Sequence, residues 1–190
     1  MMRRQKKQPK KIKKIYRIEE FSYKNKSLYD FHLECKEARN DGAITSFEIP
    51  TTTSTKSRYT TYKPIINNIQ FDSLMEAKYY VKLCYDLKDG KIKNFERQRH
   101  FELLPKFKKN GKSYRGIEYV CDFYVINKDD SYSVIDVKGK ETVEFKIKHK
   151  MFEYKYPEYS LSVIQFYEPQ SEWLTLDEIK KINKNKKKTK

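Results

Sequence analysis

The chain has 190 residues, of which 37% are apolar and 15% aromatic, and its formal net charge is +16. This apolar content is enough to build a core, so a wholly disordered chain is excluded. The three cysteines form no CxxC pair, which argues against a disulfide framework or a thiolate zinc site. No apolar run approaches the roughly 20 residues of a membrane span, and the N-terminus lacks a signal-peptide core. We therefore expect a soluble intracellular protein with no membrane partner.

The positive charge is concentrated at the two ends of the chain. Residues 1–14 contain eight cations and no acid, residues 180–190 contain seven cations and no acid, and residues 15–179 carry a net charge of only +1. We expect two disordered basic tails that attract polyanions, above all nucleic acid, through counterion release. A role in solubility alone would explain the same lysines.

Residues 15–55 are predicted to form a small N-terminal extension and a linker. A strand-like segment at 44–49 is followed by the polar, low-complexity run 51–57, which is typical of a linker. We expect the main domain at 56–170, and a C-terminal helix with the second basic tail at 171–190.

From residue 72 onward, the hydrophobic spacing predicts an α/β domain. Asp72 and Ser73 open a helix with apolar residues spaced by three and four, and Gly90 lies just past its end. Further elements are expected as strands at 91–96, 98–104, 117–126, 132–138 and 161–166, a basic turn at 108–112, and helices at 142–155 and 174–183. One face of the helix at 142–155 carries Val143, Ile147, Met151 and Tyr154. The order helix, antiparallel three-strand meander, helix, strand predicts a mixed sheet flanked by helices.

Two carboxylates, Asp122 and Asp136, are expected to face each other across the hairpin in this meander. If its loop is the five residues 127–131, the two acids fall directly opposite each other, with Cβ atoms about 5 Å apart. One of them must then be protonated unless a cation lies between them, and Mg²⁺ or Mn²⁺ is the natural oxygen-bound cation. A four-residue loop would instead pair Asp122 with Ile135.

Lys138 lies two residues after Asp136 and therefore points to the same face of the strand. An acid followed two residues later by lysine occurs eight times in this chain, so the spacing alone carries little information. This pair is distinguished by its place in a buried-type run, residues 134–137, where unpartnered charges would cost several kcal/mol. Ordinary salt bridging on a surface strand is the simpler alternative.

Glu76, in the first helix, is a further candidate acid. Ser73 and Glu76 have the spacing of a capping box, and capping alone would explain the glutamate. The helix face through Glu76 also borders the apolar stripe, so the carboxylate could lean over the sheet, and the two roles are compatible. The three histidines have no ligand spacing, and no Ser/His or Cys/His grouping stands out.

Five short motifs within residues 56–166 carry a family resemblance. They are Phe71-Asp72-Ser73 with Glu76-Ala77, Gln98 with Phe101-Glu102-Leu103, Tyr119–Phe123, Val134–Gly139 and Lys150–Pro157. They resemble the PD-(D/E)XK nuclease superfamily, and more narrowly its small phage-encoded, Holliday-junction-resolvase-like group, long catalogued as a domain of unknown function. Cys121 stands where the superfamily name has proline. The resemblance implies a restriction-endonuclease-like core and leaves residues 1–55 unexplained.

The resemblance also implies a site and an activity. Its catalytic residues would be Glu76, Asp122, Asp136 and Lys138. Mg²⁺, with Mn²⁺ as a substitute, would be held by the three carboxylates and the Val137 carbonyl, while Lys138 would orient water or stabilise charge. Residues expected to grip the phosphate backbone are Gln98, Lys146, His149, Lys150 and the basic segment 106–112. The implied activity is metal-dependent cleavage of branched or double-stranded DNA in phage recombination or replication, in the bacterial host cytoplasm.

Two other functions fit the same residues. One is a catalytically silent nuclease fold that binds DNA or a protein partner, with residues 15–55 as the interaction unit. The other is an end-cutting endonuclease of a transposition complex, which would require protein partners. The intact set of acids and lysine favours an active enzyme, because a pure binder has no need of paired carboxylates facing a phosphate. Cleavage of both strands of a two-fold junction would favour a homodimer.

Overall fold

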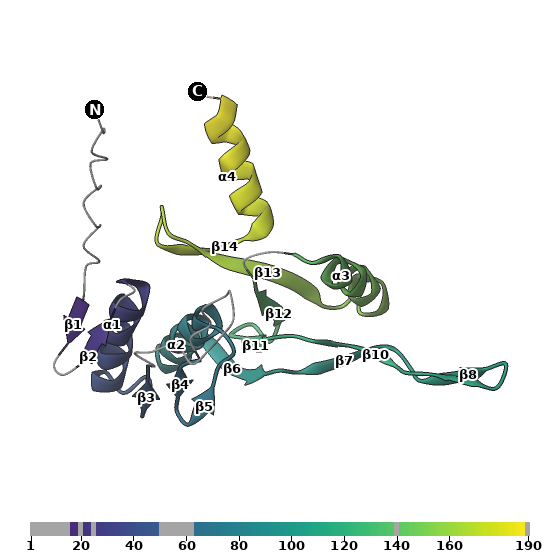
Figure 1. The fold of residues 1–190 in the computed structure, drawn as a ribbon, viewed down its shortest axis with the longest axis horizontal. Coiled ribbons are helices and arrows are strands. Elements are labelled where there is room, and N and C mark those ends of the chain that lie inside the picture. Colours follow the sequence, from purple (N-terminus) through teal and green to yellow (C-terminus); the bar gives the residue numbers. More distant parts are fainter. Residues whose placement is uncertain (1–15, 19–20, 24–25, 50–62, 139–140, 189–190) are drawn as a thin grey trace, which may run out of the picture. The chain divides into compact units, whose positions relative to one another are not determined.

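Figure 1 shows the computed structural model of the chain, which describes residues 16–18, 21–23, 26–49, 63–138 and 141–188. The chain divides into two compact units, Met1–Asp72 and Ser73–Lys190. The basic tail expected at 1–14 and the linker expected at 51–57 lie outside the described residues.

The described residues of the first unit form one helix and two small antiparallel sheets. Its elements are β1 (Tyr16–Ile18), β2 (Phe21–Tyr23), α1 (Lys26–Asn40), β3 (Phe47–Glu48), β4 (Ile65–Ile66) and β5 (Ile69–Gln70). β1 pairs with β2, and β4 pairs with both β3 and β5. The pairing of β4 with β3 explains why the first unit extends to Asp72, into the domain expected at 56–170.

The second unit is built on a five-stranded mixed sheet in the order β14-β13-β12-β11-β6. The strands are β6 (Ile92–Arg97), β11 (Phe123–Asn127), β12 (Tyr132–Val137), β13 (Ser160–Tyr167) and β14 (Glu172–Thr175). β6, β11 and β12 form the predicted antiparallel meander, β13 runs parallel to β12, and β14 returns antiparallel. The prediction of an α/β fold with a mixed sheet is confirmed, and β14 is a strand that the sequence analysis did not foresee.

Two helices, α2 (Leu74–Lys88) and α3 (Val143–Lys155), cover opposite faces of this sheet. Tyr79 of α2 packs on Phe123, with ring centroids 5.4 Å apart, whereas Phe152 of α3 and Tyr124 of β11 both pack on Phe101. Because successive residues of a strand point to opposite faces, Phe123 and Tyr124 assign α2 and α3 to different sides of the sheet.

The face of helix α3 that packs on the core differs from the face predicted from the spacing of its apolar residues. Val143 and Tyr154 are 76% and 90% exposed, whereas Phe145 and Phe152 are buried. Both phenylalanines pack against Tyr119, with ring centroids 6.2 and 5.4 Å away. The helix carries two overlapping apolar stripes, and the larger aromatic rings, which bury more area, occupy the core.

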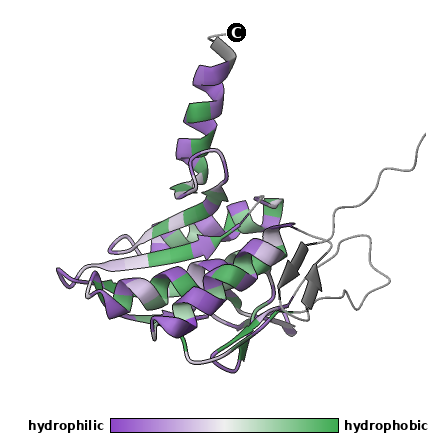
Figure 2. Ribbon diagram, turned by 90° about the vertical axis from the view of Figure 1, so that its left-hand side faces the viewer, coloured by the Kyte–Doolittle hydropathy of each residue, from purple (hydrophilic) through white to green (hydrophobic). Residues whose placement is uncertain are grey.

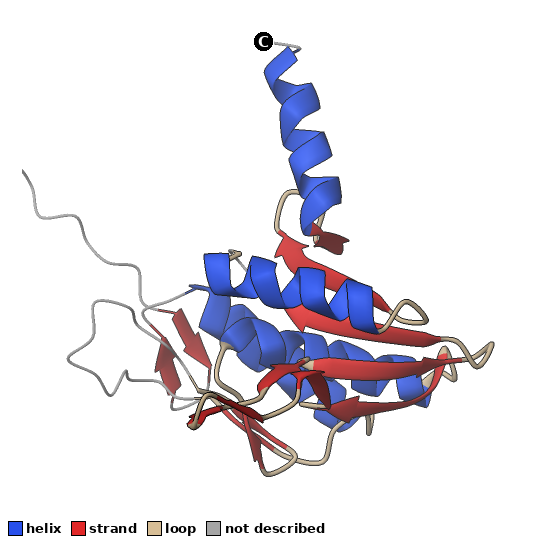
Figure 3. Cartoon of the chain, turned by 90° about the vertical axis from the view of Figure 1, so that its right-hand side faces the viewer, coloured by secondary structure: helices blue, strands red, loops and turns tan. Residues whose placement is uncertain are grey.

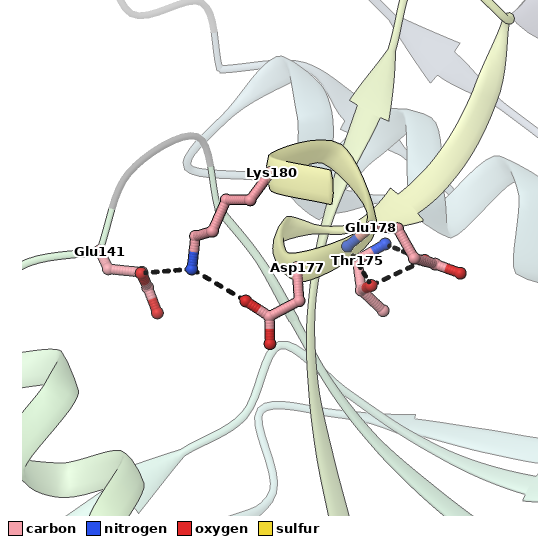
Figure 4. Close-up of polar contacts among 5 residues, drawn as sticks. All are labelled: Glu141, Thr175, Asp177, Glu178 and Lys180. Atoms are coloured by element: carbon pink, nitrogen blue, oxygen red, sulfur yellow. Dashed lines mark hydrogen bonds and ion pairs between the residues drawn. The ribbon is translucent and has the colours of Figure 1, made fainter. Parts of the chain in front are cut away.

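The C-terminal helix, α4 (Leu176–Lys188), is longer than the predicted 174–183, so the expectation of a disordered basic tail at 180–190 is wrong as far as residue 188. Its N-terminus is a capping box, in which Glu178 accepts from the Thr175 N–H at 2.8 Å and Thr175 Oγ1 accepts from the Glu178 N–H at 3.2 Å (Figure 4). Lysine is a good helix former, and cations toward a C-terminus complement the helix dipole.

Helix α4 extends away from the sheet, and hydrophobic and hydrophilic residues alternate along it (Figures 2 and 3). At its base, the Lys180 ammonium contacts Asp177 at 2.9 Å and Glu141, which precedes α3, at 3.4 Å (Figure 4). None of the helices in the described ranges has both the length and the apolar composition that crossing a membrane requires.

The strand expected over 117–126 is broken into β10 (Ile117–Val120) and β11. β10 pairs antiparallel with β7 (His100–Leu104), and beyond them β8 (Phe107–Lys109) pairs with β9 (Lys112–Tyr114). The two neighbouring segments, at residues 98–99 and 121–122, change direction together. Gln98 has a positive φ of 51°, its N–H donates to the Asp122 carbonyl at 3.2 Å, and the Cys121 N–H donates to Arg99 at 3.1 Å. This shared break starts a separate two-stranded ribbon (Figure 1).

Candidate active site

The hairpin register places Asp122 next to Asp136. Phe123 of β11 pairs with Ile135 of β12, which confirms the five-residue loop and excludes the alternative register. Asp122 lies one residue before β11, and its Oδ2 accepts a 2.7 Å hydrogen bond from the Val137 N–H. The break at Asp122 therefore turns this carboxylate toward the end of β12.

Asp136 is 2% exposed and lies in the middle of the sheet, where it pairs with Val163 of the parallel strand β13. Its Oδ2 receives a 2.5 Å contact from the Lys138 ammonium, which also lies 4.2 Å from the centre of the Phe145 ring. A buried carboxylate requires such a partner, because an unpaired charge in the core would be strongly destabilising. This ion pair agrees with the prediction that Asp136 and Lys138 point to the same side of the chain.

The register and the Val137 hydrogen bond place the two carboxyl groups on neighbouring strands, close enough for their charges to interact. Burial, followed by the negative charge of Asp136, raises the pKa of Asp122 above its ordinary value, and the charge of Glu76 adds to this. The hydrogen bond from the Val137 N–H acts in the opposite direction. The repulsion expected from the sequence is therefore present, and this buried, oxygen-rich pair fits a divalent cation such as Mg²⁺.

The Val137 carbonyl is oriented toward this pair. The Lys138 N–H donates to the Ile164 carbonyl at 3.0 Å and therefore points toward β13. In a trans peptide the carbonyl points opposite to the N–H that follows it, so the Val137 oxygen points to the other side of β12, where Asp122 lies. This orientation suits the ligand role that the resemblance implies.

Glu76 acts first as a helix cap. Its N–H donates to Ser73 Oγ at 3.1 Å, and the Ser73 hydroxyl donates to Glu76 Oε1 at 2.7 Å, so the predicted capping box is confirmed. Within the ranges that the structure describes, no three Asp, Glu, His or Cys side chains gather into a metal-binding group. The structure thus brings Asp122 and Asp136 together, while Glu76 acts on Asp122 through its charge from a longer range.

Tyr119 is a site residue that the sequence analysis missed. Its side chain is buried, and burial together with the negative charges of Asp136 and Asp122 raises the pKa of its hydroxyl. In an unbroken strand, residues 119 and 122 would point to opposite faces. The break at Cys121 changes this alternation, so Tyr119 and Asp122 share a face. The signal available in the sequence was a tyrosine, with a hydroxyl that needs a partner, inside an apolar motif.

The residues expected to contact DNA differ in how they relate to the site, and the basic segment 106–112 lies away from it, in β8 and β9 (Figure 1). Gln98 touches Asp122 through its backbone N–H. On α3, His149 contacts Glu153 at 3.4 Å and packs on Phe145, the ring beside the Lys138 ammonium. Lys146 and Lys150 are exposed on the same helix. Contact of these residues with DNA stays a prediction.

The fold and the site thus define the second unit as an α/β domain that carries a carboxylate pair and a lysine at the end of a central strand. The chain belongs to the family described as "Protein of unknown function (DUF1064)", whose model matches residues 56–168, more than half of the chain. The match includes all four candidate catalytic residues. No curated protein and no solved structure matches the chain.

Proposed function

We propose that the protein is a metal-dependent DNA endonuclease with a restriction-endonuclease-like core of the PD-(D/E)XK type, acting on double-stranded or branched DNA. The observation that carries this proposal is the hairpin register, which sets Asp122, with its Oδ2 2.7 Å from the Val137 nitrogen, beside the buried Asp136, itself ion-paired to Lys138 at 2.5 Å. Such a cluster is costly to bury, and a fold that needed only stability would do as well with apolar residues there.

The residues that would hold the ion are Asp122, Asp136 and the Val137 carbonyl, with Glu76 taking part through water. When bound, Mg²⁺ or Mn²⁺ would supply positive charge that polarises a scissile phosphate and lowers the pKa of a water molecule. The Val137 N–H fixes one oxygen of Asp122, so the carboxylate needs no reorganisation on binding. The buried position of Asp136 would keep competing water away from its oxygens.

Lys138 is placed to act on the substrate. Its side chain is 32% exposed, so the ammonium has access to solvent while Asp136 and the Phe145 ring hold it in place. A fixed ammonium at the end of β12 would orient the attacking water or stabilise the negative charge that develops on the phosphate. Its contact with Asp136 also neutralises the ground-state site before the ion enters.

The test is a nicking and cleavage assay on linear, flapped and four-way DNA with Mg²⁺. We expect the wild-type chain to cut at least one of these substrates and Asp136→Ala to cut none. Asp130→Asn is the control, because Asp130 is an exposed acid of the same hairpin that pairs with the exposed Lys93 at 2.5 Å, and asparagine tolerates its positive φ of 66°. If the wild-type chain binds DNA but cleaves none of these substrates, the proposed endonuclease activity is overturned and the catalytically silent DNA-binding module is favoured.

A further inference from the structure

A two-stranded ribbon of the second unit extends beyond the sheet and the site. β7 and β10 leave the sheet at the shared break and continue into β8 and β9, which reach the far end of the unit (Figure 1). We call residues 105–116 the arm. Every residue of the arm is exposed. At its tip, Asn110 and Gly111 have φ of 52° and 72°, the two positive angles of a tight two-residue hairpin turn.

The arm carries positive charge that forms no ion pair within the described part of the chain. It contains no acid and five cations, Lys106, Lys108, Lys109, Lys112 and Arg115. None of the five forms an ion pair with an acid among the residues that the structure describes. The register also places Lys109 directly opposite Lys112. Like charges facing each other across a strand pair are destabilising, so this pairing works against folding and suits a polyanionic ligand.

One face of the arm combines these cations with aromatic rings. Phe107 and Tyr114 are paired across the strands, their rings stack 4.7 Å apart at 5°, and each residue is 39% exposed. By strand alternation, Lys109 and Lys112 lie on the same face, one pair nearer the tip. The aromatic pair stabilises the ribbon and so helps to hold the neighbouring lysines in fixed positions.

The ribbon that joins the tip of the arm to the site has a length that matches a nucleic-acid repeat. Lys112 lies ten residues before Asp122, and a strand rises about 3.3 Å per residue, which gives a reach of at most about 33 Å. One turn of B-form DNA spans about 34 Å. A ribbon of this length lying along a duplex would bring its tip cations to phosphates about one turn away from the carboxylate pair.

We propose that the arm is a duplex-DNA-binding element that grips the phosphate backbone about one helical turn from the cleaved bond. The position relative to the cleaved bond rests on the proposed endonuclease, whereas the binding of duplex DNA by the arm does not. The stiff turn and paired strands hold the cations in place before DNA arrives, so little conformational entropy is lost on binding.

The binding test uses the full chain without divalent metal and a duplex of about three helical turns. In the arm variant Lys108, Lys109 and Lys112 are replaced by glutamine, and in the matched control the exposed Lys26, Lys91 and Lys128 are replaced likewise. We expect the arm variant to bind at least about tenfold more weakly, with the slope of log affinity against log salt reduced by about 2 to 3. Equal losses in arm and control variants, or an unchanged slope, would overturn the proposal.

A charge-conserving variant and a single-stranded probe sharpen this result. Replacement of the same three lysines by arginine should retain wild-type affinity, because the phosphate contacts need charge at these positions. The wild-type advantage over the arm variant should be largest on duplex DNA. An equal advantage on a single strand of the same length would overturn duplex recognition. Matching melting temperatures of all the variants would establish that the fold is intact.

The distance is tested with duplexes shortened on one side of the cleaved bond. Wild-type cleavage at subsaturating enzyme should fall when fewer than about 10 base pairs remain on the side that the arm contacts, and the arm variant should lack this dependence. Identical length dependence in both proteins would refute the one-turn placement. If the wild-type chain cuts no DNA, the proposed endonuclease function is overturned. The metal-free difference in duplex affinity between the wild-type chain and the arm variant still decides whether the arm binds duplex DNA.

Discussion

The end of β12 and the arm differ in how their charged side chains are placed: the acid at the end of β12 is buried and ion-paired, and the cations of the arm are exposed. At the end of β12, Asp136 is almost fully buried, and its charge is matched by Lys138. In the arm, the cations are exposed, and two lysines face each other across the hairpin. A buried charge must be compensated within the fold, whereas an exposed charge is screened by water and salt until a ligand replaces them. The first region is therefore built for a fixed arrangement of atoms, and the second for a long, uniformly charged partner.

Loss of a carboxylate from the buried region should have the largest effect. We expect Asp122→Asn to abolish Mg²⁺-dependent cleavage while DNA affinity stays intact or tightens, because the change removes both a metal ligand and an anion that repels phosphate. Cleavage rates and metal-free binding would be measured on the same substrate, with Asp130→Asn as the control. Near wild-type cleavage by Asp122→Asn would show that the hairpin site is wrongly assigned.

Lys138→Arg separates the position of the charge from its chemistry. Arginine keeps the charge but has a planar fork that stays protonated, so it cannot replace a compact lysine that positions water as an ammonium or deprotonates it as a neutral amine. We expect a loss of at least about a hundredfold in the cleavage rate, with metal binding retained. Lys91→Arg, at an exposed lysine, serves as the control. A Lys138→Arg enzyme that cuts at the wild-type rate would leave the carboxylate site in place and remove lysine from the mechanism.

Deletion of residues 1–14 tests whether the cations of that segment contribute to DNA binding as those of the arm do. The deletion removes eight cations, so binding should weaken on every DNA sequence and the salt slope should fall by several units. The carboxylate pair is local to the hairpin, and cleavage at low salt should therefore survive. Titrations at four or more salt concentrations would reveal the slope. An unchanged slope would mean that these residues do not touch DNA.

The smallest expected effect is on the stability of the metal-free protein. Burial and the charge of Asp136 raise the pKa of Asp122 above its ordinary value of 3.8. At pH values between the unfolded-state and folded-state pKa, Asp122 is therefore protonated in the folded chain and ionised in the unfolded chain. Relative to Asp122→Asn, the wild-type chain should lose stability as the pH rises from about 4 through the raised folded-state pKa, and then stay level. The Asp122→Asn substitution should therefore raise the melting temperature above that of the wild-type chain by a few degrees at pH 8, equivalent to about 1–2 kcal/mol. At pH 4 it should change the melting temperature by almost nothing.

Addition of Mg²⁺ is the control for this last prediction. A cation between the carboxylates relieves the repulsion that disfavours the ionised Asp122, so the wild-type chain should gain stability at pH 8 and the Asn variant should gain much less. Calorimetry of both proteins at the two pH values, with and without the ion, makes the comparison. A difference between the variants that does not change with pH would contradict the raised pKa of Asp122.

Local signals in the sequence determined most of the elements and the central pair of the site. The polar loop at 127–131 has a length that sets the hairpin register, and the register alone places Asp122 near Asp136. The Ser73–Glu76 capping box likewise marks the start of α2, since it depends only on neighbours along the chain. These features were predictable because short-range spacing decides them.

Only the tertiary structure decided the features that depend on distant partners. The break at Cys121 requires hydrogen bonds to the segment at 98–99, and it is this break that brings Tyr119 to the carboxylates. The buried face of α3 was selected by aromatic rings on other elements, and β14 exists through its pairing with β13. A strand edge, a bulge or a choice between two apolar stripes carries no sufficient local signal, because its free energy comes from contacts that the sequence spacing does not reveal.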